Sequence, residues 1–219
     1  MHLNNSQNSK PMFDHFLANK PNPIKNNKLR SLKTGQPIFY EGDTARGLYE
    51  VVEGVVRNYK LTADGRRQIV SFGYPGDIIG INHDGCHHND CDAISDVTLK
   101  AIDQKTDTDF AYSLIRYTAA ELTLMHEHFL LLGRKSAMEK VASFLNVLQN
   151  RIGKRDGKSV CYDLPMNRTD IADYLGLSIE TVSRCFSKLR QEGIIGLPQI
   201  NQVCIYDLGA LQGLTEVEH

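Results

Sequence analysis

The sequence of 219 residues contains no apolar run long enough to cross a membrane, and its polar start, MHLNNSQNSK, lacks the hydrophobic segment of a signal peptide. We therefore expect a cytoplasmic protein without a membrane partner. The chain also lacks an excess of positive charge, because 25 lysines and arginines are balanced by 26 aspartates and glutamates. A uniformly basic nucleic-acid binder is excluded, so any contact with DNA must come from local placement of cations.

Cysteine is scarce as well, with five residues in the chain. That number in a chain of this size favours reduced thiols over a disulfide framework. Outside residues 86–91, the histidines and carboxylates form no recognisable nucleophile–base or metal–water arrangement, which argues against an enzyme.

The most informative segment is residues 167–189, NRTDIADYLGLSIETVSRCFSKL, where two short amphipathic helical patterns flank a glycine. Asn167 stands at the N-cap of the first pattern with Asp170 three residues later, and Ser178 caps the second. Gly176 supplies the positive φ that lets a helix end in a tight turn. This arrangement predicts a helix-turn-helix, the unit that inserts its second helix into the DNA major groove.

The second helix of this unit has two distinct faces. Arg184 can donate two hydrogen bonds to a guanine, and Glu180, one turn earlier, can accept one from the amine of a cytosine. A solvent-exposed ion pair is the plainer alternative at this spacing, but the caps, the small Ala172 and the glycine turn in register favour base reading. Ser183 and Ser187 share the polar face, and the opposite apolar stripe consists of Ile179, Val182, Phe186 and Leu189.

The rest of the chain divides by its hydrophobic period, and the parts together predict an α+β fold. Residues 1–26 have little periodicity and predict a flexible N-terminal arm. Residues 27–108 hold β-rich runs punctuated by glycine and predict an antiparallel β-roll. Residues 109–137 predict a long helix, and residues 138–219 a winged helix-turn-helix domain whose wing is formed by the runs IIGL and QVCIYDL.

A heptad seam runs along the predicted long helix, at alternating steps of three and four residues. One interpretation is that this stripe packs against the β-roll of the same chain. A helix with a heptad stripe needs a partner, however, and a second copy of the chain is the simplest supplier. The predicted dimerisation residues are Ile115, Thr118, Leu122, Met125, Phe129 and Leu132.

The segment DIADYLGLSIETVSR resembles the recognition unit of the CRP/FNR family of bacterial transcription regulators, in its FixK/FNR-like branch. The likeness extends upstream through FYEGD, EGVVR, DGRRQIVSF and PGDIIG, and it covers nearly everything after residue 30. It implies a β-roll like that of cyclic-nucleotide-binding domains, a dimerisation helix and a winged helix-turn-helix. It also implies a homodimeric transcription activator that binds a palindromic operator with TTGAT-type half-sites and contacts RNA polymerase.

The resemblance also assigns residues to these contacts. The branch reads its half-site with a Glu-x-x-Ser-Arg signature, which here is Glu180, Ser183 and Arg184. Ile179 stands where the CRP type carries an arginine, which argues against the TGTGA preference of that type. The expected contacts to DNA phosphates are Arg168, Thr169, Ser178 and Lys188.

Two kinds of ligand site occur in relatives of this family, and the sequence lacks the residues that form either of them. Relatives that respond to cyclic AMP hold its ribose and phosphate with a glutamate and an Arg-Ser pair, but these positions here are Ile81 and Cys91-Asp92. Relatives that sense oxygen hold an iron–sulfur cluster with cysteines, but no cysteine precedes Cys86, and the position in the roll is Lys100. We therefore expect no built-in cofactor. The alternative is a regulator gated by a small molecule, a metal or a redox change.

Two features that contain cysteine keep this alternative open. Zinc prefers the side chains found at Cys86, His87, His88 and Cys91. Their spacing matches no standard zinc finger, so a plain hydrophilic loop is the preferred interpretation. Cys185 directly follows Arg184, and core packing of its thiol is preferred to a redox switch.

Overall fold

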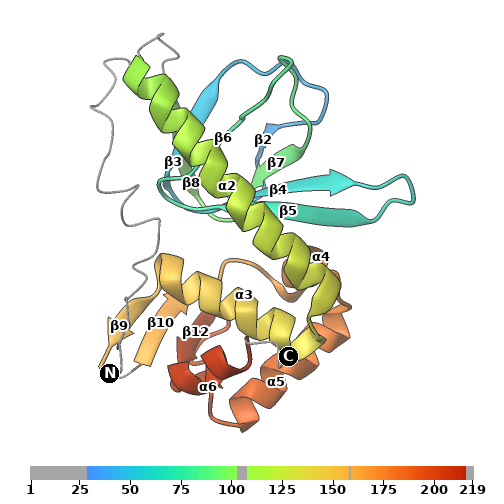
Figure 1. Cartoon of the computed structure of the whole chain (residues 1–219), viewed down its shortest axis with the longest axis vertical. Helices are drawn as coiled ribbons and strands as arrows, with labels where there is room; N and C mark the ends of the chain where they lie inside the picture. The colour runs from blue at the N-terminus through green and yellow to red at the C-terminus, as the bar shows by residue number, and fades with distance from the viewer. Residues whose placement is uncertain (1–28, 103–107, 158, 216–219) are drawn as a thin grey trace, which may run out of the picture.

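The computed structural model describes residues 29–102, 108–157 and 159–215. The predicted N-terminal arm, residues 1–26, lies outside the described residues. Figure 1 shows a β-rich lobe, a long helix that crosses it diagonally, and a second lobe of helices around a small sheet. The α+β fold class predicted from the sequence is confirmed.

The first lobe consists of two four-stranded antiparallel sheets with strand orders β1-β8-β3-β6 and β2-β7-β4-β5. Buried aliphatic residues from both sheets meet in one core, which includes Val51, Val56 and Leu99. Gly54 makes the turn between β3 and β4 with a φ of 82°, and an added Cβ there would lie 2.1 Å from the Asp96 carbonyl oxygen. The strands are β1 Leu29–Leu32, β2 Pro37–Phe39, β3 Leu48–Glu53, β4 Val56–Leu61, β5 Arg67–Gly73, β6 Ile78–Ile79, β7 Asp90–Ala93 and β8 Val97–Ile102.

Two consecutive helices connect the lobes. The long helix α2 spans Thr108–Arg134 and is held to the roll by Tyr117, whose buried hydroxyl accepts a hydrogen bond from the Ile78 amide at 3.0 Å. The helix α3 spans Ala137–Ile152 and begins at a capping box formed by Ser136 and Glu139. No helix among the described residues is long and apolar enough to cross a membrane.

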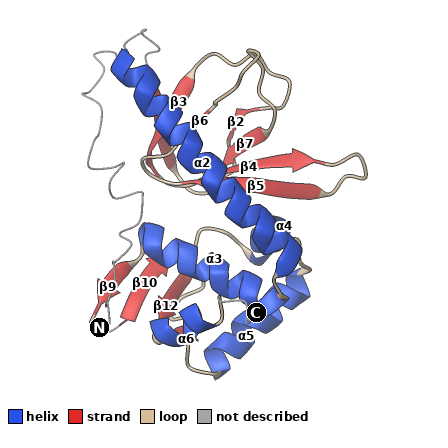
Figure 2. Ribbon diagram, viewed as in Figure 1, coloured by secondary structure: helices blue, strands red, loops and turns tan. Residues whose placement is uncertain are grey.

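The second lobe places the predicted helix-turn-helix against a four-stranded sheet of order β11-β12-β10-β9 (Figure 2). The predicted wing is the hairpin β11–β12. Its strand β12 pairs with β10, and β10 pairs with β9; the sequence patterns did not indicate these two further strands. The elements are β9 Lys154–Asp156, β10 Ser159–Asp163, α4 Arg168–Leu175, α5 Ile179–Gln191, β11 Ile195–Gly196, β12 Gln202–Ile205 and α6 Leu208–Gly213.

The prediction of reduced thiols was wrong for two of the five cysteines. Cys161 of β10 and Cys204 of β12 form a disulfide in this sheet. They are directly opposite each other in the antiparallel register, with their Cα atoms 4.1 Å apart, although 43 residues separate them in the chain. Only the tertiary pairing of β10 with β12 brings them together, and no local pattern reports that pairing.

The two lobes share one hydrophobic core. Phe72 of the roll, Phe144 of α3 and Tyr174 of α4 contact one another with ring centroids 5.2–6.4 Å apart. Arg151 of α3 adds an ion pair to Asp77 of the roll. The orientation of the helix-turn-helix is therefore set by contacts with the roll as well as by its own sheet.

Candidate nucleic-acid interface

The helix-turn-helix is built from local signals that the sequence displays. Asn167 accepts a hydrogen bond from the Asp170 amide, and the Asp170 carboxylate accepts one from the Asn167 amide, which makes a capping box at the start of α4. Gly176 ends α4 in the left-handed region with φ 61° and ψ 43°. Ser178 caps α5 by accepting from the Thr181 amide at 3.2 Å. All three roles match the sequence predictions.

Replacing Gly176 with alanine is expected to lower the free energy of unfolding by about 1 kcal/mol. The cost comes from the left-handed backbone, because an added Cβ has room: its nearest neighbour would be Leu132 Cδ2 at 3.7 Å. Urea denaturation of both proteins measures the difference. Gly133→Ala is the matched control, because this glycine lies within helix α2 with open space around it and alanine favours a helix. Equal stability of Gly176→Ala and the parent would contradict the assigned strain.

The inner face of α5 anchors the helix in the core. Val182, Phe186 and Leu189 are buried there, as the predicted apolar stripe requires. Ile179 departs from the prediction, because its side chain is 43% exposed. Ile179 is the first residue of α5, and the first buried residue of the stripe is Val182, about one turn later. The buried part of the stripe is therefore shorter than the sequence period indicated.

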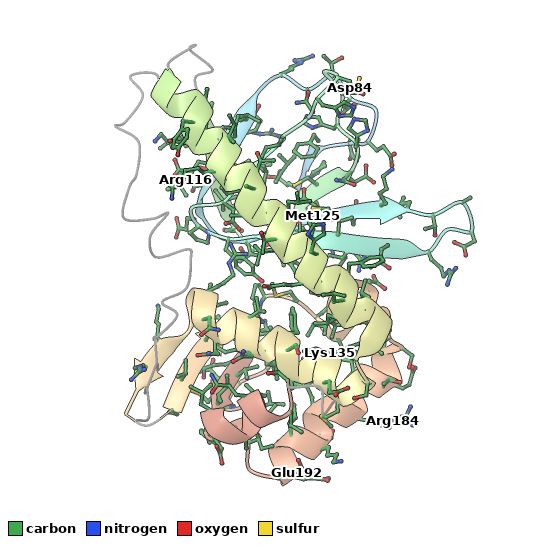
Figure 3. All side chains as sticks on the ribbon, viewed as in Figure 1. Asp84, Arg116, Met125, Lys135, Arg184 and Glu192 are labelled. Atoms are coloured by element: carbon green, nitrogen blue, oxygen red, sulfur yellow. A yellow bond between two sulfur atoms is a disulfide. The ribbon has the colours of Figure 1, made fainter. Side chains whose placement is uncertain are left out.

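The outer face of α5 carries the predicted base-reading residues. Arg184 and Glu180 are exposed and Ser183 is half-exposed, and Figure 3 shows Arg184 projecting from the outer edge of the lobe. Among the residues described, Arg184 makes one hydrogen bond, a long one of 3.4 Å to Thr181 Oγ1. The pKa of Glu180 is lowered by its own backbone amide, by Ser178 and by Arg184, so this side chain is an acceptor at neutral pH. The face therefore offers the Glu180 carboxylate as an acceptor and the exposed Arg184 guanidinium as a donor.

The predicted phosphate contacts surround this face but differ in how they are held. Thr169, Ser178 and Lys188 are exposed. Lys188 Nζ lies 3.8 Å from Glu192 Oε1 in a solvent-exposed ion pair. Arg168 is half-buried, with its guanidinium 3.5 Å from the centre of the Phe186 ring. Burial lowers the pKa of Arg168, though a guanidinium remains charged at neutral pH.

An ion-pair network behind α4 was missed by the sequence analysis. Asp170 accepts from Arg57 and Arg67 of the roll, the latter at 2.8 Å, and its side chain is 3% exposed. Arg67 also reaches Asp173 at 2.7 Å, and Arg57 holds Asp92 within the roll. The contacts to Asp170 and Asp173 cross more than 100 residues of sequence and hold the first helix of the motif against the roll.

The predicted dimerisation residues lie on one exposed face of α2. The apolar side chains of Ile115, Leu122, Met125 and Phe129 are 52–76% exposed, and Thr118 is exposed beside them. Leu132 is different, because it is half-buried and packs against the core shared by the two lobes. Figure 3 shows Met125 near the middle of the helix.

Cys185 lies beneath the base-reading face and is 7% exposed. Burial raises the pKa of its thiol, so the reactive thiolate is depleted near neutral pH. We expect iodoacetamide at pH 7.5 to modify Cys86 well before Cys185, and unfolding in urea to make the two react alike. Peptide mass spectrometry along a time course measures both rates. Preferential labelling of Cys185 in the folded protein would contradict the packing role and support a redox switch.

The candidate metal ligands of residues 86–91 are not brought together. Cys91 is buried in β7, and burial raises the pKa of its thiol above the usual range. His87 is buried against the Phe39 ring at a centroid distance of 3.7 Å. Cys86 is half-exposed and His88 is exposed, with its Nε2 3.0 Å from an oxygen of Asp84. The four candidate ligands therefore form no single ligand set.

Comparison with known proteins matches both lobes. A model of the Crp-like helix-turn-helix domain covers residues 139–214, and a model of the cyclic nucleotide-binding domain covers residues 29–110. The nitrogen fixation regulation protein FixK of Bradyrhizobium diazoefficiens is 45% identical over 173 residues, which are 75% of this chain and 72% of that protein. FixK of Rhizobium meliloti is 36% identical over 195 residues, which are 89% and 90% of the two chains. The solved structure of FixK2 from Bradyrhizobium japonicum superposes with a TM-score of 0.81 at 37% identity, and the match covers 89% of this chain and all of that one.

The residues of the roll do not fit a cyclic nucleotide bound in the usual mode. Ile81, at the position expected to hold the ribose, has no hydrogen-bonding side chain. At the position expected to hold the phosphate, the Cys91 thiol is buried and the Asp92 carboxylate is bound to Arg57. A carboxylate repels a phosphate diester, so the likeness to this domain concerns its fold.

Proposed function

The chain belongs to the CRP/FNR family of transcription regulators, in its FixK-like branch, and we propose that it binds a palindromic DNA operator as a homodimer. It is a DNA-binding regulator and not an enzyme. The single observation that carries the proposal is the exposed pair Glu180 and Arg184, one turn apart on the outer face of a firmly anchored α5.

Each residue of the face has a specific role in this proposal. Arg184 donates to O6 and N7 of the guanine in a TTGAT-type half-site, and Glu180 accepts from the amine of the paired cytosine. Ser183 helps to select the outer thymine. Lys188, Arg168 and the helix-start hydroxyls of Thr169 and Ser178 hold the phosphates and fix the register of the helix in the groove.

We propose that the seam on α2 packs against the same seam of a second copy of the chain. Four large apolar side chains that line one face of a helix favour association, because water would otherwise contact all of them. Pairing of two parallel helices generates a two-fold axis, and two recognition helices related by that axis read half-sites about one helical turn apart. We further propose that the bound dimer acts in the cytoplasm as an activator that contacts RNA polymerase.

Selection of bound DNA from a random pool, with purified cofactor-free protein, tests the proposal. We expect enrichment of a two-fold symmetric sequence with TTGAT-type half-sites whose centres are about one helical turn apart. Sedimentation of the complex should give two chains per duplex. Enrichment of an asymmetric single site, or of no sequence, would contradict the proposal.

A second candidate function, control of DNA binding by a small molecule, is favoured by a cavity of about 810 Å³ where α2, α3 and β5 meet. His128 lines it, and both ring nitrogens are buried without a hydrogen-bond partner among the residues described. Burial lowers the pKa of His128, so an uncharged ligand with a donor or acceptor suits the neutral ring. Native mass spectrometry detects a retained ligand, whereas full DNA affinity of ligand-free protein would contradict gating.

A further inference from the structure

Three metal-ligand side chains gather in a loop that the DNA-binding function does not use. The loop follows β6 and contains His83, Asp84 and His88, all three of them exposed. Figure 3 shows Asp84 at the far end of the roll from Arg184. This set differs from the cysteine-containing quartet that the ligand types along the sequence offered as a candidate.

The geometry of the three side chains brings their ligand atoms together. One ligand atom from each residue lies within 4.8 Å of the other two. The Asp84 carboxylate is 3.0 Å from His88 Nε2 and 4.0 Å from His83 Nε2. The two imidazole rings are stacked with centroids 5.1 Å apart, so the carboxylate and both rings share one side of the loop.

The distances are close to those that one metal ion requires. Zinc binds imidazole nitrogen and carboxylate oxygen at about 2.0–2.2 Å, which places two ligands of a tetrahedral ion roughly 3.4 Å apart. The side chains are exposed, so a shift of about an ångström can close the remaining gap without repacking the core. Coordination would replace the His88–Asp84 contact.

The backbone around the ligands is held on both sides. Asp84 accepts from the Cys86 amide at 3.2 Å, and Asn82 accepts from the Gly85 amide at 2.9 Å. The His87 amide donates to the Asp43 carbonyl at 3.0 Å, and the Gly42 amide donates to the His87 carbonyl at 2.8 Å. His87 points inward and anchors the loop, which leaves its neighbour His88 outside with Asp84.

We propose that His83, Asp84 and His88 bind one divalent transition-metal ion, with water in the remaining coordination positions. Two imidazoles and one carboxylate suit borderline ions such as Zn²⁺, Ni²⁺ and Cu²⁺, whereas Mg²⁺ and Ca²⁺ prefer sets made of oxygen alone. The bound ion links the two ends of the loop and restricts the motion of its exposed side chains. The site shares no residue with the DNA interface, so the metal site and the proposed function are tested separately.

Titration calorimetry of the tag-free full chain with Zn²⁺, after removal of metals with a chelator, tests the site. We expect one ion per chain and a loss of affinity of at least about tenfold in the double variant His83→Ala/His88→Ala, because both imidazole ligands are gone. His126→Ala is the matched control, since it removes an exposed histidine from α2, and it should bind as the parent does. Thermal unfolding without metal checks that each variant is folded.

Cu²⁺ gives a readout that identifies the ligands. Electron paramagnetic resonance of the one-to-one complex should show coupling to two imidazole nitrogens, and each single histidine variant should lose one. Cys86→Ser should leave binding unchanged, because the thiol is outside the proposed set. Absence of stoichiometric binding, retention of binding in the double variant, or loss of binding in Cys86→Ser would each overturn the proposal.

Discussion

Replacing Asp170 with alanine is expected to lower the free energy of unfolding by about 3–5 kcal/mol, the cost of breaking a buried ion-pair network by removing its central carboxylate. Asp170 is almost fully buried and accepts from two guanidinium groups, those of Arg57 and Arg67. Its removal leaves both cations facing the start of α4 and also deletes the carboxylate that accepts from the Asn167 amide. Urea denaturation followed by circular dichroism measures the change.

Two further variants separate the sources of this loss. Asp170→Asn keeps a side-chain oxygen for the capping box but removes the charge, so we expect it to retain most of the destabilisation. Asp173→Ala is the matched control, because Asp173 is partly exposed and, within the described part of the chain, forms its ion pair with Arg67 alone. It should cost about 1 kcal/mol or less. A loss below 1 kcal/mol in Asp170→Ala would show that the network does not hold α4 on the roll.

Replacing Phe129 with glutamate is expected to separate the proposed dimer and to weaken operator binding by at least about a hundredfold. Phe129 is 76% exposed on the seam of α2, and a second copy would place its own seam against it. A carboxylate there carries an unpaired charge into the apolar contact. The affinity for the operator then falls, because each monomer binds one half-site alone and no longer benefits from a second linked recognition helix.

Sedimentation equilibrium and a mobility-shift titration measure the two effects of Phe129→Glu. Thr123→Glu is the matched control, since it adds the same charge to an exposed position of the same helix away from the seam. It should remain dimeric with parental affinity. A dimeric Phe129→Glu variant with unchanged affinity would contradict the role of the seam.

The helix-turn-helix could be predicted from the sequence because its signals are local. Caps at Asn167 and Ser178, the left-handed Gly176 and the buried Val182 each depend on neighbours a few residues away. The same reasoning wrongly grouped Ile179 with the buried residues. A helical period shows which residues share a face, but it does not show how much of that face the rest of the protein covers. The exposure of the first turn depends on the rest of the lobe.

Features that depend on distant segments could not be predicted. The Cys161–Cys204 disulfide requires the pairing of β10 with β12, and Asp170 meets Arg57 only when the second lobe packs on the roll. The loop before β7 shows the same limit on a smaller scale. His87 and Cys91 turn inward there, so the four candidate ligands do not come together, and the position of His83 beside Asp84 and His88 depends on the folded loop.

The most direct test of base reading by α5 is the affinity of Arg184→Ala for the selected operator and for each of its single-base variants. We expect a loss of about 1–3 kcal/mol on the selected operator and no discrimination at the G·C pair that Arg184 contacts, with selectivity at the other positions retained. Lys188→Ala is the comparison, and it should weaken all sequences alike. If Arg184→Ala also weakens all sequences alike and keeps its selectivity at that pair, this arginine does not read a base and the account is wrong.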